Sequence, residues 1–131
     1  MASFIIADVR KFAMYNLRKR RILRRKSDFQ RVYRSGRSFA NRYLVLYVIK
    51  SQQRDGLTGF AAGKKLGNAV TRNRVKRLLR ESYRKNQFFL KKGYNLLLVG
   101  RLAAVPEKCK TLEKAFRSLA KKAGLWEENS K

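Results

Sequence analysis

The segment at residues 43–50, YLVLYVIK, constrains the fold more than any other part of this sequence. β-branched and aromatic residues predominate in it, and these residue types favour an extended strand. Because successive side chains of a strand point to opposite sides, the segment has apolar residues on both faces. We therefore expect burial of both faces, or one face on the core and the other used for binding. Both alternatives require a sheet with other elements packed against it.

The remaining pattern predicts an α+β single domain. Two more strands are expected, at residues 57–63 and 94–101. Three helices are expected, at residues 27–34, 69–86 and 106–123. Ser27 suits the N-cap of the first helix, Gly36 its end, and Pro106 the first turn of the last. A tight loop is expected at 64–68. Because no internal repeat or linker interrupts this order, we expect helices to cover one sheet.

The charge of the chain points to a polyanionic partner. The sequence of 131 residues has 34 Lys or Arg against 8 Asp or Glu, a formal net charge of +26, and no His. Such a chain repels itself unless a polyanion neutralises it. Nucleic acid is the abundant intracellular polyanion, and an anionic membrane surface is the alternative. Because 44% of the residues are hydrophobic, the chain is too apolar for a disordered basic tail.

The same composition excludes several kinds of catalytic site. With no His and one Cys, His-based triads, Cys–His dyads and common transition-metal sites are absent. The eight carboxylates are mostly scattered in sequence, whereas two-metal hydrolysis by a protein needs a carboxylate cluster. The lone Cys109 cannot form an internal disulfide, which is consistent with a reducing intracellular compartment. No apolar run is long enough to span a membrane.

The N-terminal part divides into two segments. Residues 1–16 are mixed apolar without a clear signal-peptide pattern, and we interpret them as an N-terminal extension to a domain at 17–131. Residues 17–26, LRKRRILRRK, form a basic arm that is either solvated or in contact with phosphates. Its charged residues are Arg18, Lys19, Arg20, Arg21, Arg24, Arg25 and Lys26.

The helix expected at 69–86 has one apolar face and one basic face. On a helical wheel, one side contains Val75, Leu78, Leu79 and Ser82. The side almost opposite contains Asn73, Lys76, Arg77, Arg80 and Arg84, flanked by Arg72 and Arg74. A solvated helix face usually mixes charge signs, because like charges at i,i+4 destabilise a helix. This face has three like-charge pairs at that spacing and one opposite pair, Arg77–Glu81. Its composition therefore favours contact with nucleic acid over simple solvation.

The loop before this helix superficially resembles a phosphate-binding P-loop. It has three residues between Gly59 and Gly63 where four are needed, and Lys65 replaces the Ser or Thr that binds magnesium. Nucleotide hydrolysis is therefore a poor interpretation. Lys64, Lys65 and the loop amides still form a plausible phosphate contact beside the helix start.

Residues 59–81, GFAAGKKLGNAVTRNRVKRLLRE, resemble the signature of the bacterial ribonuclease P protein family. The centre of that signature is the motif Arg72-Asn73-Arg74. DFQRVYRSGRSFANRYLVLYV, at 28–48, is similar to the family's first helix and long strand, and YNLLLVGR and the last helix also fit. The resemblance covers about residues 17–125, whereas residues 1–16 depart from the family pattern.

The resemblance implies a fold and a function. The implied fold is a roughly four-stranded sheet with three helices, similar to the second domain of a small-subunit ribosomal protein, with a left-handed βαβ crossover. The implied function is that of the protein subunit of ribonuclease P, a cytoplasmic endoribonuclease that cuts the 5′ leader from precursor tRNA. The RNA subunit is catalytic and holds most of the Mg²⁺, so the protein has no catalytic residue. The implied partners are ribonuclease P RNA and precursor tRNA, without a membrane or an obligate protein partner.

The resemblance also assigns residues to two surfaces. The first surface is expected to contact RNA, and the basic helix face adds Arg84 to the residues that the resemblance implies. The full set is Lys64, Lys65, Asn68, Arg72, Asn73, Arg74, Lys76, Arg77, Arg80 and Arg84. Phe29, Tyr33 and Tyr47 are expected to line a cleft for the single-stranded leader, between the first helix and the sheet. From the residue pattern alone, core packing is the better interpretation of Phe29 and Tyr33; the resemblance favours stacking on bases.

Three other functions remain to be distinguished from this one. A generic structural RNA-binding protein, such as a ribosomal protein, would have the same charge. A DNA-binding regulator could use residues 69–86 as its recognition helix, although a strand and a glycine loop precede them instead of a helix-turn-helix partner. A membrane-surface protein could be anchored through residues 1–16.

Overall fold

A computed structural model describes residues 26–51 and 56–127 of the chain, with side chains from residue 29 onward. One mixed sheet has the strand order β1-β2-β4-β3. Its strands are β1 (Arg37–Ala40), β2 (Leu44–Lys50), β3 (Thr58–Ala62) and β4 (Tyr94–Gly100). β2 is antiparallel to β1 and β4, whereas β3 is parallel to β4. The expected α+β single domain is confirmed.

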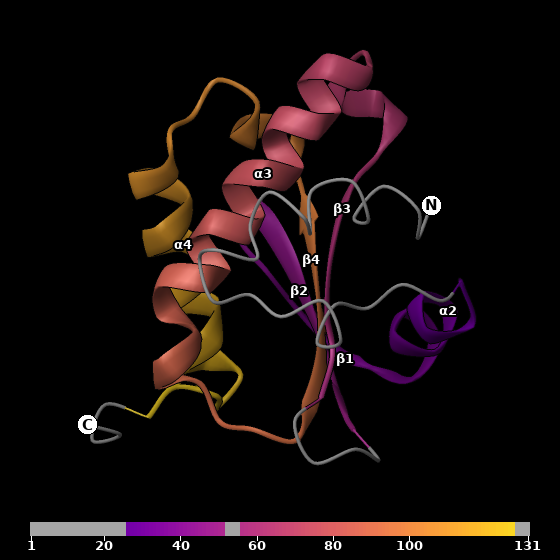
Figure 1. The fold of residues 1–131 in the computed structure, drawn as a ribbon, viewed down its shortest axis with the longest axis vertical. Coiled ribbons are helices and arrows are strands. Elements are labelled where there is room, and N and C mark those ends of the chain that lie inside the picture. Colours follow the sequence, from indigo (N-terminus) through magenta and orange to yellow (C-terminus); the bar gives the residue numbers. More distant parts are fainter. Residues whose placement is uncertain (1–25, 52–55, 128–131) are drawn as a thin grey trace.

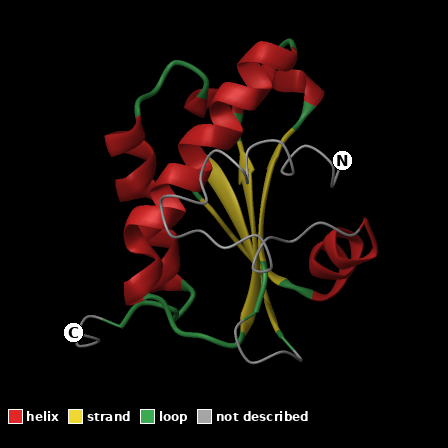
Figure 2. Cartoon of the chain, viewed as in Figure 1, coloured by secondary structure: helices red, strands yellow, loops and turns green. Residues whose placement is uncertain are grey.

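Within the described residues, three helices cover the two faces of this sheet. They are α2 (Lys26–Ser35), α3 (Ala69–Asn86) and α4 (Cys109–Lys122). Figure 1 shows α3 and α4 side by side on one face and α2 on the other. Helices and strands account for most of the described chain, with short loops between them (Figure 2). No helix in the described ranges is both long and apolar enough to cross a membrane.

The central strand β2 resolves the two alternatives that its sequence allowed. Leu44, Leu46 and Val48 are buried, whereas Val45, Tyr47 and Ile49 alternate with them and are partly exposed. Leu44 pairs with Gly100, which faces α3, so the buried residues belong to the core beneath α3 and α4. The other face of the strand is only half covered, by α2.

Helix α3 begins and ends where the sequence predicts. Asn68 has an extended backbone, and its side chain accepts a hydrogen bond of 2.9 Å from the Thr71 amide, which caps the helix. Val75 and Leu79 are completely buried against the sheet. A Cβ atom on Gly100 would lie 2.5 Å from Val75 Cγ1, so only glycine lets the helix approach the sheet this closely.

The structure differs from the predicted elements at four places. The short strand β1 was not located from the sequence, because it is mostly exposed and lacks alternating apolar residues. The loop expected at 64–68 contains a turn of 3₁₀ helix, η4 (Lys64–Leu66). Helix α2 begins at Lys26, so Ser27 lies inside the helix and not at its N-cap. The fourth difference concerns the last helix.

Helix α4 begins at Cys109, three residues after the predicted start at Pro106. The chain first forms a 3₁₀ turn, η6 (Leu102–Ala104), and then a short connection. In this connection the carbonyls of Val105 and Glu107 accept hydrogen bonds from Arg74 of α3. A tertiary contact therefore holds these residues outside the helix, although the proline would tolerate a helical first turn.

Candidate nucleic-acid interface

Positive charge is concentrated at the start of α3 and on its outward side. Lys64 and Lys65 in η4 are exposed, and so are Asn73 and Arg77, while Arg72 is partly exposed. We call these five residues the α3 basic side. The first turn of α3 contains no acidic residue, and the positive end of the helix dipole lies there. The α3 basic side therefore suits binding of an anion.

Arg72 and Arg77 differ in how they are held. The Nε atom of Arg72 is buried and has no hydrogen-bond partner in the described part of the chain. Arg77 is exposed, and among residues 26–51 and 56–127 no salt bridge to it is recorded. Arg77 thus keeps donors that an external acceptor could satisfy, and the partly exposed Arg72 adds a second guanidinium group. A phosphate matches the planar geometry of both groups.

Arg84 forms a salt bridge with an acidic residue of its own helix. Its Nη2 atom lies 2.6 Å from Oε1 of Glu81, and its Nε atom donates to Oε2 at 3.3 Å. The i,i+4 spacing would pair Glu81 with Arg77, but the structure pairs it at i,i+3 with Arg84. The acid thus offsets the charge of Arg84 and leaves Arg77 to the α3 basic side.

Lys76 and Arg80 are not on an exposed face, and this part of the wheel interpretation is wrong. Lys76 is 7% exposed and Arg80 only 1%. Their positions on the helix adjoin Tyr83, which is also buried. The buried part of α3 therefore includes basic residues as well as apolar ones. Long basic side chains can be buried in this way because their aliphatic stems pack against apolar neighbours.

Two other residues predicted to contact RNA have structural roles. The side chain of Asn68 is the N-cap of α3, which also positions the loop that precedes it. Arg74, in the Arg72-Asn73-Arg74 motif, donates from Nη1 to the Val105 carbonyl at 2.5 Å and from Nη2 to the Glu107 carbonyl at 2.7 Å. We call this pair of bonds the Arg74 clamp. Sequence reasoning missed it, because no local pattern relates residue 74 to residues 105–107.

A separate aromatic pair lies on the opposite face of the sheet. The rings of Tyr33 in α2 and Tyr47 in β2 are edge to face, with their centroids 4.8 Å apart. Tyr33 is 38% exposed, but Phe29 is only 3% exposed and belongs to the hydrophobic core. Burial, and then the nearby Tyr47, raise the pKa of the Tyr33 hydroxyl, so it is neutral at physiological pH. The structure thus brings two of the three predicted cleft residues together at the surface.

Of the basic arm, Lys26 begins α2, and Arg18 to Arg25 lie outside the described residues, as does the expected extension at 1–16. Within the described ranges, no three His, Cys, Asp or Glu side chains are grouped to hold a metal ion. Burial, more than any neighbouring charge, raises the pKa of the Cys109 thiol, which keeps it protonated and weakly nucleophilic.

Taken together, the sheet, the α3 basic side and the exposed tyrosine pair define a single-domain α+β nucleic-acid-binding protein. The model of the family Ribonuclease P matches residues 17–124 of the chain. The ribonuclease P protein component of Clostridioides difficile is 38% identical over 104 residues, covering 79% of this chain and 91% of that protein. That of Natranaerobius thermophilus is 43% identical over 107 residues, covering 82% and 93%. The chain therefore belongs to the ribonuclease P protein family, which provides the protein component of an endoribonuclease.

Solved structures of the family have the same fold. The ribonuclease P protein of Staphylococcus aureus superposes with a TM-score of 0.73 at 28% identity, covering 81% of this chain and 97% of that one. The protein of Thermotoga maritima gives a TM-score of 0.70 at 27% identity, covering 77% and 96%. These similarities favour the ribonuclease P protein over a generic structural RNA-binding protein such as a ribosomal protein.

The Arg74 clamp predicts a stability role for one residue of the basic motif. Replacing Arg74 with Ala should lower the free energy of unfolding by about 1 kcal/mol, because two charge-assisted hydrogen bonds at an exposed site are lost. Arg74→Lys should recover little, since an ammonium group lacks the planar fork. Urea unfolding would measure both. Arg77→Ala is the matched control and should change stability by less than about 0.5 kcal/mol; equal effects at the two positions would contradict the clamp.

Proposed function

We propose that the chain binds the catalytic RNA of ribonuclease P through the α3 basic side and assists removal of the 5′ leader from precursor tRNA. The observation that carries this proposal is the exposed positive charge on α3 without a neutralising acid. Glu81 is the one acidic residue of this helix, and it forms a salt bridge with Arg84. The family membership of the chain supports RNA as the partner.

The chemistry of the α3 basic side favours the phosphate backbone as its target. Lys64, Lys65 and Arg77 are exposed, and each can release a counterion from the RNA by neutralising one phosphate. Arg72 is partly exposed in the same turn of the helix as Asn73, and its guanidinium group offers a planar set of donors to the same phosphates.

We further propose a division of labour between the two subunits. The RNA would hold most of the Mg²⁺ and carry out hydrolysis, while the protein would contribute positive charge and substrate contacts. The expected setting is the bacterial cytoplasm, where precursor tRNA is available.

The aromatic pair is the proposed contact for the single-stranded leader. Tyr33 is exposed enough for a base to stack on its ring, and Tyr47 holds that ring from the side. Stacking of this kind is tolerant of sequence, because every base has a π face. Phe29 would support α2 from the core and would not itself stack on RNA.

Reconstitution tests the proposal as a whole. The purified full chain should stimulate cleavage of precursor tRNA by a bacterial ribonuclease P RNA at low Mg²⁺ concentration. The measurement is the rate of release of the 5′ leader with and without the chain. A rate equal to that of the RNA alone would refute the proposed function.

The proposed phosphate contacts predict a change in salt dependence. The double variant Arg72→Ala/Arg77→Ala should bind ribonuclease P RNA more weakly, and the slope of log affinity against log salt should become shallower by about 0.7–0.9 per lost contact. Titrations at several KCl concentrations would measure it. Lys114→Ala, which removes an exposed charge from α4, should leave the slope unchanged. An unaltered slope in the double variant would show that these arginines do not contact phosphate.

The proposed leader contact predicts selective loss of substrate affinity. In the reconstituted holoenzyme, Tyr33→Ala should weaken binding of leader-bearing precursor about five- to hundredfold, since one stacked base contributes about 1–3 kcal/mol. Binding of mature tRNA should not change. Tyr33→Phe keeps the ring and should bind the precursor nearly as well as the parent chain. Equal losses for precursor and mature tRNA would argue against a leader contact at Tyr33.

A further inference from the structure

A small pocket lies at the far end of α3 from the Arg72-Asn73-Arg74 motif. It has a volume of about 210 Å³, which is below the range of about 300–1,000 Å³ that is typical of sites for drug-sized ligands. The residues that line it are Thr58, Tyr83, Gln87, Phe88, Leu90, Lys91, Lys92, Tyr94 and Leu96. They come from β3, β4, the end of α3 and the connection between α3 and β4.

Two hydroxyl groups face this pocket from positions that are otherwise buried. Thr58 is 4% exposed and Tyr83 is 7% exposed. Neither hydroxyl makes a hydrogen bond to another residue in the described ranges, whereas the ring of Tyr83 is held edge to face by Phe60 and Phe116. Neither oxygen is among the buried side-chain atoms of the described chain that lack a hydrogen-bond partner, so both hydroxyls are accessible from the pocket. Each can therefore bond to a polar ligand that enters it.

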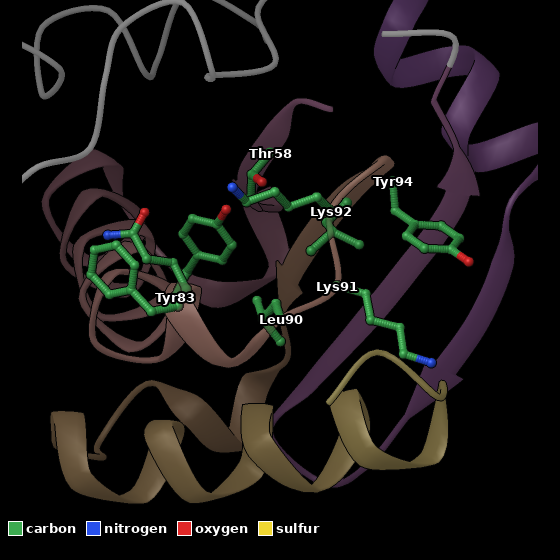
Figure 3. A pocket seen from close by; sticks show the side chains of 9 residues that line it. Thr58, Tyr83, Leu90, Lys91, Lys92 and Tyr94 are labelled. Atoms are coloured by element: carbon green, nitrogen blue, oxygen red, sulfur yellow. The ribbon is translucent and has the colours of Figure 1, made fainter. Parts of the chain in front are cut away.

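A positive charge reaches the same point. Figure 3 shows the side chain of Lys92 extending across the pocket, toward the side that Thr58 and Tyr83 line. Lys91 also lines the pocket but points toward its other side in Figure 3. No acidic residue is among the lining residues. One ammonium and two hydroxyl donors that line the same pocket without an acid suit an anion with several oxygens.

An exposed aromatic ring stands beside these donors. Phe88 is 71% exposed, so its side chain lies at the surface of the protein where it lines the pocket. An exposed aromatic beside positive charge is the arrangement that single-stranded nucleic acid uses for stacking. The pocket thus combines donors for a phosphate with a surface for a base.

We propose that this pocket binds one nucleotide, with its phosphate on Thr58, Tyr83 and Lys92 and its base stacked on Phe88. The nucleotide could belong to an RNA strand or be free, since both present the same phosphate and base. The small volume admits a phosphate with part of its ribose and leaves the base outside, against the exposed ring.

This site is distinct from both surfaces of the proposed function. Gln87 follows the last residue of α3 and lies fifteen residues after Arg72, which at about 1.5 Å per residue places it about 20 Å away along the helix. Thr58 pairs with Leu96, which belongs to the core face of β4, whereas Tyr47 faces α2. The pocket therefore lies on the other side of the sheet from the aromatic pair.

Binding to the purified full chain tests this proposal without the RNA subunit. Chemical shifts in ¹⁵N spectra would be followed during titration with inorganic phosphate, with AMP and UMP, and with a short single-stranded oligoribonucleotide. We expect nucleoside monophosphates to bind saturably at the amides of residues 87–96, at least about fivefold more tightly than phosphate, because stacking adds about 1 kcal/mol or more. Binding of the oligonucleotide but not of AMP or UMP would also support the site and identify an RNA strand as the source.

Variants separate the two parts of the site. Tyr83→Phe removes one hydroxyl and should weaken nucleotide binding about fivefold, and Lys92→Ala should weaken it about tenfold, because the lost bond is charge-assisted. Phe88→Ala should weaken nucleotide binding but leave phosphate binding unchanged. Lys114→Ala is the control for loss of one positive charge, and thermal unfolding verifies that each variant folds.

Three outcomes would overturn the proposal. One is the absence of shifts at these amides with every ligand, and another is equal affinity for phosphate and nucleotide. The third is an equal loss of nucleotide affinity in Lys114→Ala and Lys92→Ala, which would indicate nonspecific attraction. None of them would affect the reconstitution test of the proposed function, which depends on the α3 basic side.

Discussion

The close packing of α3 on the sheet at Gly100 is the constraint on which the rest of the structure depends. A side chain at this position would collide with Val75, so the missing Cβ sets how near the helix lies to β4. That distance places Tyr83 against Phe60 and Phe116 and brings Arg74 within reach of the connection before α4. The α3 basic side is presented outward because the opposite side of the helix is seated on the core.

The basic residues of α3 have different physical roles although they look alike in sequence. Arg77 is exposed for external contacts, Arg74 holds a loop, Arg84 is paired with Glu81, and Arg80 is buried. A guanidinium group can fill any of these roles, because it combines a long apolar stem with five donors in a plane. Its surroundings decide which role it takes. The net charge of the chain is therefore not a measure of the charge that is available to RNA.

The helices and strands that bury an apolar face were predictable, whereas the start of α4 was not. The bounds of α3 followed from its apolar periodicity, and the strand β2 followed from the β-branched and aromatic residues of its segment, although which of its faces is buried did not. The start of α4 was not predictable, because Arg74 holds the carbonyls of Val105 and Glu107 from a distant part of the chain. The burial of Phe29 could be inferred from its spacing with Val32, and here the residue pattern was a better guide than the resemblance.

By itself, the sequence determined that the chain folds as an α+β domain and requires a polyanionic partner. Both conclusions rest on local quantities, namely hydrophobic periodicity and the excess of Lys and Arg over Asp and Glu. Only the tertiary structure decided which basic side chains are exposed and which are buried, paired or clamped. It also decided that Thr58, Tyr83 and Lys92 converge on one pocket, although up to 34 positions separate them. Such groupings depend on how helices and strands pack, and packing is a property of contacts between residues that are distant in sequence.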